Sequence, residues 1–330
     1  MYYFIVNPVS GKGKAATAVP VIEKRMGESG QDYIILYTES DNDFDRIAGL
    51  INVDKAQAVV CIGGDGTIQQ YIGLTVGRDV PFGVIPVGSG NDFLYSLQEA
   101  VDRAGLKPGA AEDAAASAVQ DGANDHPAGD VSYTGKFPSF EDKVLFFTNK
   151  VLEGATIPVD AVSVNGAHHI LNIAGTGIDI EVLKSALPLK KYLGGGAYFL
   201  SLMKNAATYR AEEITLTVDG YTEKDRYLLL AICNGAYYGG HMRVAPPAAI
   251  DDGFITLCIV RKMPRLKLMA LFPSVKPGRH VRFKEVSFTN CLSVKLEFEG
   301  TRTINFDGNL PEFESPLVFE LLRGAVRFIM

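Results

Sequence analysis

Three glycine-rich turns hold the residues whose types and spacing could do chemistry. They occupy residues 7–14, 63–67 and 88–93, and each follows a short apolar run. Glycine permits positive φ and lets a bulky anion approach the backbone without a clash at Cβ. A helix that begins directly after such a turn presents free N–H groups and a partial positive charge, which both favour phosphate. The turns therefore predict a site for phosphate groups.

A single turn of this type also fits a plain strand-to-helix connection, with Thr67 or Asn91 as the helix N-cap. Three turns at one edge of a parallel sheet favour a ligand, because open α/β folds bind ligands at the carboxyl ends of their strands. The spacing matches neither G-x-x-x-x-G-K followed by Ser or Thr nor the dinucleotide motif G-x-G-x-x-G, so the phosphate cradle is of another kind. The side chains that could add hydrogen bonds are Asn7, Ser10, Thr67, Ser89 and Asn91.

The N-terminal part of the chain alternates apolar runs with helical patterns, which predicts a parallel sheet covered on both faces. We expect strands at residues 2–6, 32–37, 56–62 and 82–87, and helices at 15–26 (interrupted at Pro20), 44–52, 67–76 and 91–99. Apolar periodicity is lost from about residue 105 to 139, which indicates an insert, and another helix is expected at 140–153.

The chain becomes strand-rich after Thr156. Strands are expected at residues 158–164, 168–174, 213–218, 227–233, 254–260, 286–288, 292–298 and 302–306. Alternating apolar and polar residues indicate antiparallel sheets with one face exposed to solvent. We therefore expect an α/β nucleotide-binding domain at 1–155, to which residues 317–330 return, and a mainly antiparallel β-sandwich domain at 156–316.

The composition of the chain limits the classes of partner that it could bind. The net charge of −6 argues against nucleic acid. No run reaches the roughly 18 apolar residues of a spanning helix, and residues 2–6 open a strand without a leader, so we expect a cytoplasmic protein that meets a membrane only peripherally. The four cysteines lie in apolar runs far apart in sequence, which predicts buried free thiols.

Residues 261–284 contain eight Lys or Arg and no Asp or Glu, interleaved with apolar residues. Such a segment could rest on anionic headgroups, where each cation adds about 1 kcal/mol. It could equally be a helix that covers the second domain, with its lysines merely solvated. Prolines 264, 273 and 277 limit any helix to about two or three turns.

The ordered motifs resemble the diacylglycerol kinase catalytic family, which includes bacterial soluble diacylglycerol kinases and the sphingosine and ceramide kinases. The resemblance covers nearly the whole chain outside residues 105–139. It rests on NPVSG (7–11), GGDGT (63–67), PVGSGNDF (86–93), NIAGTGID (172–179), NG (234–235), AP (245–246), DDG (251–253) and DG (307–308). GGDGT by itself is shared with NAD kinases and 6-phosphofructokinases, whereas the ordered set is more specific.

The resemblance implies a kinase that uses ATP and Mg²⁺, with catalysis between an N-terminal NAD kinase/diacylglycerol kinase-like domain and a C-terminal β-sandwich. It implies catalytic roles for Asp65 and Asp307, and a structural magnesium at Asp252 assisted by the backbone carbonyls near Ala249 and Phe254. Together with the turn residues above, the implied ATP site comprises Asn7, Pro8, Ser10, Gly11, Thr38, Gly63, Gly64, Asp65, Gly66, Thr67, Gln69, Ser89 and Asn91.

Two departures from the family pattern bear on catalysis. Asn309 replaces the Glu usually assigned as proton acceptor, and Gln69 and Gln70 stand where an Asn and a Glu are common. An amide cannot act as a general base, so either Asp65 or Asp307 takes that role or the activity is reduced. The simpler interpretations are a turn carboxylate bonded to its own backbone for Asp65, a hairpin turn for Asp307, and a plain Asp-Asp-Gly turn for Asp252.

We therefore expect an ATP-dependent lipid kinase that phosphorylates a lipid hydroxyl, foremost that of diacylglycerol, to give phosphatidic acid. An NAD kinase-like enzyme and a non-catalytic nucleotide- or lipid-binding protein are the alternatives. Diacylglycerol, a sphingoid base and a polyprenol all offer a primary hydroxyl and an apolar tail, so the lipid stays open. The oligomeric state is open too, a homodimer included.

Overall fold

The computed structural model describes residues 1–40, 43–88, 90–106, 132–193, 201, 204–205 and 208–330. The chain forms two compact units, which are described separately. Unit 1 comprises Met1–Val159 and Val326–Met330, and unit 2 comprises Asp160–Ala325. Among the described residues, no helix is both long and apolar enough to cross a membrane. Residues 107–131, most of the predicted insert, lie outside the described residues.

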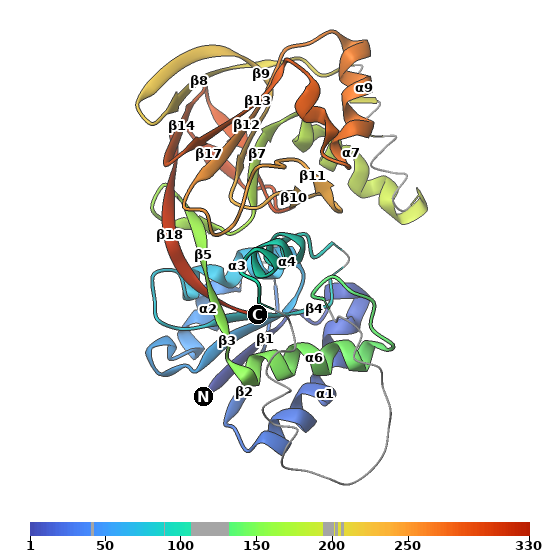
Figure 1. Ribbon diagram of the computed structural model, residues 1–330, viewed down its shortest axis with the longest axis vertical. Coiled ribbons are helices and arrows are strands. Elements are labelled where there is room, and N and C mark those ends of the chain that lie inside the picture. Colours follow the sequence, from blue (N-terminus) through green and yellow to red (C-terminus); the bar gives the residue numbers. More distant parts are fainter. Residues whose placement is uncertain (41–42, 89, 107–131, 194–200, 202–203, 206–207) are drawn as a thin grey trace. The chain divides into compact units, whose positions relative to one another are not determined.

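A parallel sheet forms the centre of unit 1, in the order β2-β1-β3-β4 followed by the end of β18 (Figure 1). Strands β1, β3 and β4 are buried along their whole length, as their continuous apolar runs predict. The bounds of the first four strands are β1 Tyr2–Val6, β2 Tyr33–Tyr37, β3 Ala58–Gly63 and β4 Phe82–Pro86. The predicted parallel sheet is confirmed.

Helices flank this sheet, and α1 packs beside α6 (Figure 1). The helices of unit 1 are α1 Lys14–Ser29, α2 Phe44–Leu50, α3 Asp65–Tyr71, α4 Phe93–Arg103 and α6 Phe140–Glu153, with 3₁₀ turns η1 Ser10–Gly13, η2 Val53–Lys55 and η3 Ile72–Leu74. The predicted interruption at Pro20 is wrong, because α1 continues through it. Pro20 is exposed while Ala15, Ile22 and Met26 are buried on the other side, so the packed face holds the helix despite the lost hydrogen bond.

Unit 2 is mainly antiparallel, as predicted. Its largest path runs β13-β12-β9-β8-β14-β18, and β7 pairs with both β9 and β16. Its strands are β5 Thr156–Val164, β6 His168–Ile170, β7 Ile173–Gly177, β8 Glu212–Val218, β9 Tyr221–Cys233, β10 Tyr237–Tyr238, β11 Met242–Arg243, β12 Ile255–Arg261, β13 Val286–Cys291, β14 Ser293–Glu297, β15 Thr301–Thr303, β16 Asn305–Phe306, β17 Glu312–Glu314 and β18 Leu317–Ile329. The strand predicted at 168–174 is two strands, because the chain leaves the sheet at Leu171 and Asn172.

Alternation along β9 divides unit 2 into two apolar cores. Leu230 and Ile232 point into one core, and Ala231 and Cys233 point into the other. The second core is covered by helical segments, which are α7 Ile178–Leu193, α9 Arg265–Val275 and the 3₁₀ turn η4 Arg279–Arg282. All four cysteines are buried and free, as predicted.

The C-terminal strand β18 belongs to both units. Its first part pairs antiparallel with β14, from Leu317 beside Leu296 to Glu320 beside Ser293. Only Val326–Met330 belong to unit 1, so the return predicted from residue 317 begins nine residues later. Phe328 is fully buried there, with its ring centroid 5.9 Å from that of Phe82 and 4.9 Å from that of Phe93.

Replacing Phe328 by Ala should lower the free energy of unfolding by about 3–5 kcal/mol, because it leaves a cavity between β4 and α4. Urea denaturation followed by circular dichroism measures this loss. Tyr221→Ala is the matched control, since that ring is 75% exposed and its loss should stay within about 0.5 kcal/mol. Equal losses in the two variants would contradict the role given to Phe328.

Candidate active site

The first turn packs directly against the third. Gly11, Lys12 and Gly13 have left-handed backbone, with φ of 61°, 60° and 91°. A Cβ on Gly11 would lie 2.1 Å from the carbonyl oxygen of Val87, so only glycine fits there. The Ser10 amide donates to the Asn7 carbonyl at 3.0 Å, which keeps the turn tight.

The second and third turns meet through their backbones. The Gly63 carbonyl accepts from the amides of Val87 at 2.9 Å and Gly88 at 3.2 Å. A Cβ on Gly88 would lie 2.6 Å from the Cα of Gly64, closer than any side chain allows. Three glycine-rich turns therefore do gather at one sheet edge. Ser89 lies outside the described residues, so its place in this site stays a prediction.

Asp65 links the second turn to the third. Its Oδ1 accepts from the amide of Phe93 at 3.1 Å, across 28 residues of sequence and at the first residue of α4. This contact goes beyond the simpler interpretation of a carboxylate bonded only to its own turn. The Asn91 side chain donates to the Gly88 carbonyl at 2.9 Å and so braces the third turn from within.

A second carboxylate, Asp92, lies near Asp65. Burial raises the pKa of Asp65, the nearby Asp92 charge raises it further, and the amides of Phe93 and Asp92 partly offset both effects. A Cβ on Gly90 would lie 3.1 Å from an Asp65 oxygen and 3.6 Å from an Asp92 oxygen, so the two carboxylates flank Gly90. Asp92 was not among the site residues predicted from the sequence. Its one signal was its position after Asn91 in the third turn.

The remaining residues expected in the ATP site, Thr67, Thr38 and Gln69, lie at different positions around the turns. Thr67 is buried, and its side chain occupies the space that a Cβ on Gly63 would need. The Thr38 amide donates to the Val6 carbonyl at 2.9 Å, which places Thr38 at the same sheet edge, and Gln69 lies on α3. Thr67 and Asn91 are not the helix N-caps, because these positions belong to Gly64 and Asp92.

A cationic pair lies at the beginning of α1. Lys14 follows the first turn directly, and its Nζ lies 5.6 Å from the centroid of the Phe140 ring on α6. Burial lowers the pKa of Lys143, also on α6, and the positive charge of Lys14 lowers it further. An anion beside the first turn would relieve this repulsion. Neither lysine was predicted from the sequence as a site residue.

Asp307 lies in unit 2, in a two-residue hairpin turn between Phe306 and Asn309. The amide and carbonyl of these two residues exchange hydrogen bonds of 2.8 and 2.9 Å, and Asp307 and Gly308 have φ of 49° and 98°. The hairpin interpretation is therefore confirmed. The carboxylate has a further contact, since its Oδ1 accepts from the Ile173 amide at 2.9 Å. Its catalytic role stays a prediction.

Next to this hairpin lies a polar cluster around Asp179, the last residue of the NIAGTGID motif. Asn305 donates to Asp179 Oδ2 at 3.2 Å, and Tyr238 also hydrogen-bonds to this carboxylate. Burial raises the pKa of Asp179 to about 6, although both hydrogen bonds work in the opposite direction. The sequence analysis quoted Asp179 only as part of a motif and gave it no role.

Asp252, at the predicted magnesium position, makes a hydrogen bond within its own turn. Asp252 is exposed, and its Oδ1 accepts from the Phe254 amide at 3.0 Å, which is the plain turn of the simpler interpretation. The guanidinium of Arg323 donates to the neighbouring Gly253 carbonyl at 3.0 Å. Among the described residues, no group of three or more His, Cys, Asp or Glu side chains could hold a metal ion. The predicted site combines one carboxylate with backbone carbonyls, which that search does not cover, so the set of Asp252, Ala249 and Phe254 stays a prediction.

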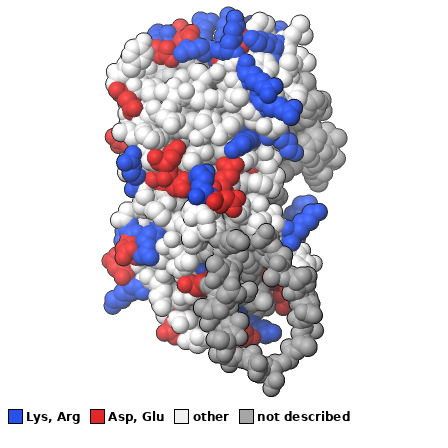
Figure 2. Space-filling model, in the orientation of Figure 1, with Lys and Arg blue, Asp and Glu red and all other residues white. Residues whose placement is uncertain are grey.

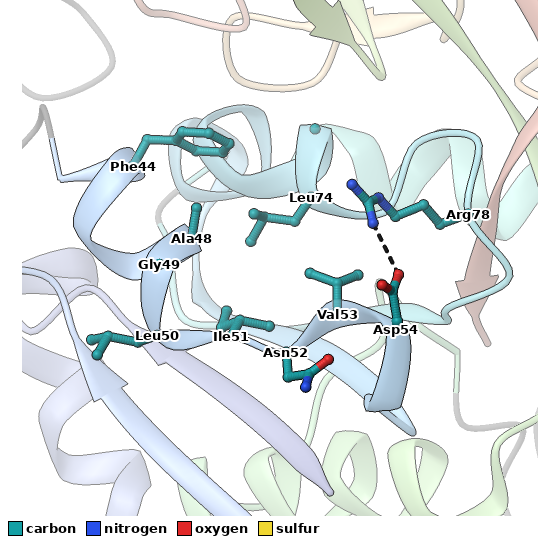
Figure 3. Close-up of a pocket in the computed structure, with 11 residues that line it drawn as sticks. Phe44, Ala48, Gly49, Leu50, Ile51, Asn52, Val53, Asp54, Leu74 and Arg78 are labelled. Atoms are coloured by element: carbon teal, nitrogen blue, oxygen red, sulfur yellow. Dashed lines mark hydrogen bonds and ion pairs between the residues drawn. The ribbon is translucent and has the colours of Figure 1, made fainter.

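A pocket of unit 1 lies away from the glycine-rich turns (Figure 3). Leu50, Ile51 and Asn52 line it from the segment that leads into β3, and Arg78, paired with Asp54 at 3.1 Å, lines it from the segment that leads into β4. These segments precede their strands, so the pocket lies at the amino-terminal edge of the sheet. It does not belong to the phosphate site.

Two family models match the chain, one on each part. Residues 1–126 match the diacylglycerol kinase catalytic domain, and residues 172–330 match the YegS C-terminal NAD kinase beta sandwich-like domain. Fold and matches together define a kinase, a phosphotransferase built on a parallel α/β unit and a β-sandwich unit. These two matches, which together cover most of the chain, confirm the resemblance to diacylglycerol kinases seen in its motifs.

Relatives match over nearly their full lengths. A diacylglycerol kinase of Mycobacterium tuberculosis is 27% identical over 322 residues, which cover 96% of this chain and 90% of the relative. One of Bacillus subtilis is 24% identical over 307 residues, covering 92% and 88%. The crystal structure of a diacylglycerol kinase from Bacillus anthracis superimposes with a TM-score of 0.68 at 22% identity, over 99% of this chain and 96% of that one, and supports the fold.

The raised pKa of Asp65 predicts a stability that depends on pH. When the pKa of a carboxyl is higher in the folded than in the unfolded protein, its protonation favours the folded state. This stabilising contribution is complete at pH values below the unfolded-state pKa. It is lost as the pH rises through the folded-state pKa. Asp65→Asn carries no charge and should therefore raise Tm at pH 7, by roughly 2–4 °C. The gain should shrink as the pH falls toward 3.8, the ordinary aspartate pKa.

Differential scanning fluorimetry across this pH range measures the gain. Asp54→Asn is the matched control, since its side chain is 86% exposed and it should leave Tm nearly unchanged. A lower Tm for Asp65→Asn at pH 7 would mean that the hydrogen bond to α4 outweighs the cost of burying the charge.

Proposed function

We propose that this protein transfers the γ-phosphoryl group of ATP to the hydroxyl of a lipid, foremost diacylglycerol. The observation that carries the proposal is the convergence of three glycine-rich turns, of which Asp65 links the second and third at the N-terminus of α4. Backbone amides and a helix N-terminus favour a polyphosphate at this edge. The relatives named diacylglycerol kinase support a lipid acceptor.

The carboxylates in unit 1 fit the Mg²⁺ that accompanies ATP. Magnesium in kinases is held by one or two carboxylates together with phosphate oxygens, and Asp65 and Asp92 offer such a pair. The mutual repulsion that helps to raise the pKa of Asp65 is what a divalent cation would relieve. When bound, the ion would neutralise charge that develops on the transferred group.

The reaction forms a bond between the lipid oxygen and the γ-phosphorus and breaks the bond to the bridging oxygen of ADP. The hydroxyl proton must leave during this transfer, and a carboxylate is the expected acceptor. Asp65 belongs to the proposed metal pair, so we assign Asp307 to orienting or deprotonating the hydroxyl. We place the enzyme in the cytoplasm at the inner face of a membrane, because ATP and membrane lipid meet there.

A labelled-ATP assay against lipids in mixed micelles tests the proposal. We expect transfer to diacylglycerol, and Asp65→Ala and Asp307→Ala should each lower kcat by about 100-fold or more. Asp54→Ala, far more exposed, is the control and should keep full activity. The panel contains a sphingoid base, a polyprenol and NAD. Preferred transfer to NAD would support the NAD kinase-like alternative. That alternative rests on the GGDGT motif and on the match of residues 172–330 to an NAD kinase beta sandwich-like domain.

The Asn309→Glu variant examines the non-catalytic alternative. Asn309 is exposed at the end of the Asp307 hairpin, so the fold should tolerate either a carboxylate or a longer amide. We expect Asn309→Glu to raise kcat by about tenfold in the same assay, because it restores a general base where the family has one. Asn309→Gln is the matched neutral control. Equal rates for the two variants would show that this position contributes no base.

A further inference from the structure

Helix α9 of unit 2 is fixed by one apolar face. Leu268, Leu271 and Val275 are buried at helical spacing in the second core of the unit. The Lys267 ammonium pairs with Glu285 at 2.6 Å at one side of the helix. Farther along, His280 is buried in η4, with its Nε2 2.8 Å from the Val244 carbonyl oxygen. These contacts hold α9 and η4 against the unit, so their outer residues have fixed positions.

The outer face of α9 is apolar as well. Leu266 is 82% exposed and Met269 is 36% exposed, and with the exposed Ala270 and Pro273 they form a second stripe at spacing i, i+3, i+4 and i+7. A helix on the surface of a soluble protein ordinarily turns polar residues outward. An apolar stripe on the solvent side therefore indicates a partner that takes apolar side chains.

Cations surround this stripe. Arg265, Lys276, Arg279 and Arg282 are exposed, and none of them makes an ion pair with any described residue. Residues 261–284 contain no Asp or Glu, although the whole chain has a net charge of −6. Figure 2 shows Lys and Arg gathered along the edge where Figure 1 labels α9. We name Arg265, Leu266, Met269, Lys276, Arg279 and Arg282 the α9–η4 surface.

We propose that the α9–η4 surface docks this protein on an anionic lipid bilayer. The combination of unpaired cations with exposed Leu and Met matches a membrane interface, where headgroup phosphates meet the cations and the acyl boundary accepts the apolar tips. A protein partner would need acidic residues arranged around an apolar groove, whereas a bilayer supplies both features without a defined shape. Docking concerns unit 2 alone and does not require the transfer reaction.

Vesicle co-sedimentation of the full chain without ATP tests the proposal. We expect binding to phosphatidylcholine vesicles that contain phosphatidylglycerol, weak binding to phosphatidylcholine alone, and loss of binding at high salt. Replacing Lys276, Arg279 and Arg282 by Gln should weaken binding on the order of 100-fold. Replacing Lys24, Lys55 and Lys136 by Gln changes the net charge equally, from −6 to −9, and should leave binding within about twofold.

Leu266→Glu tests the apolar stripe and should weaken binding by about tenfold or more. Leu292→Glu is its matched control, at an exposed Leu elsewhere in unit 2, and should bind like the wild type. Thermal melts establish that each variant is folded. Equal loss in the two triple variants, or a wild type that ignores the anionic lipid, would overturn the proposal. So would a dimer that Leu266→Glu dissociates while vesicle binding stays unchanged.

Activity separates docking from the proposed reaction. The Lys276, Arg279 and Arg282 triple variant should lose activity on diacylglycerol in anionic vesicles but keep it on a short-chain, water-soluble diacylglycerol. Failure of the wild type on both substrates would count against the proposed function and leave the docking result intact. Equal loss of activity on both substrates would show that the three cations act in some way other than docking.

Discussion

Backbone-to-backbone contact between the turns is the constraint on which the site of unit 1 depends. Gly11 lies against the Val87 carbonyl and Gly64 against Gly88, closer than any side chain allows. These contacts bring the ends of β1, β3 and β4 together. Glycine at these positions also allows a bulky anion to approach the backbone. The same packing lets Asp65 accept a hydrogen bond from α4. It also buries Asp65 near Asp92, and burial and the Asp92 charge raise the pKa of Asp65.

Charge is distributed to suit two different ligands. The glycine-rich turns collect a carboxylate pair suited to a cation that accompanies polyphosphate, whereas the α9–η4 surface collects cations without acidic partners among the described residues. The docking proposed for the α9–η4 surface needs a partner that offers negative charge and an apolar boundary together.

Local patterns predicted much of the fold. The strands of unit 1 follow from short apolar runs, and the turns follow from the glycine-rich segments after three of these runs. Both signals lie in residues that are neighbours in sequence. The errors arose where distant contacts decide. Packing holds α1 together through Pro20, β14 keeps residues 317–325 in unit 2, and Asp92 gains significance only because Asp65 lies beside it. The roles of Asp307 and Asp252 could not be derived from local patterns either, since each residue also serves a turn.

Strand β18 has a consequence for how the chain is made. Unit 1 closes its sheet with residues that follow the whole of unit 2 in sequence, and Phe328 fills the space between β4 and α4. A nascent chain on the ribosome therefore holds β1 to β4 for a long interval without their last neighbour. During that interval one edge of β4 lacks its partner, and a chaperone that shields open sheet edges would act there.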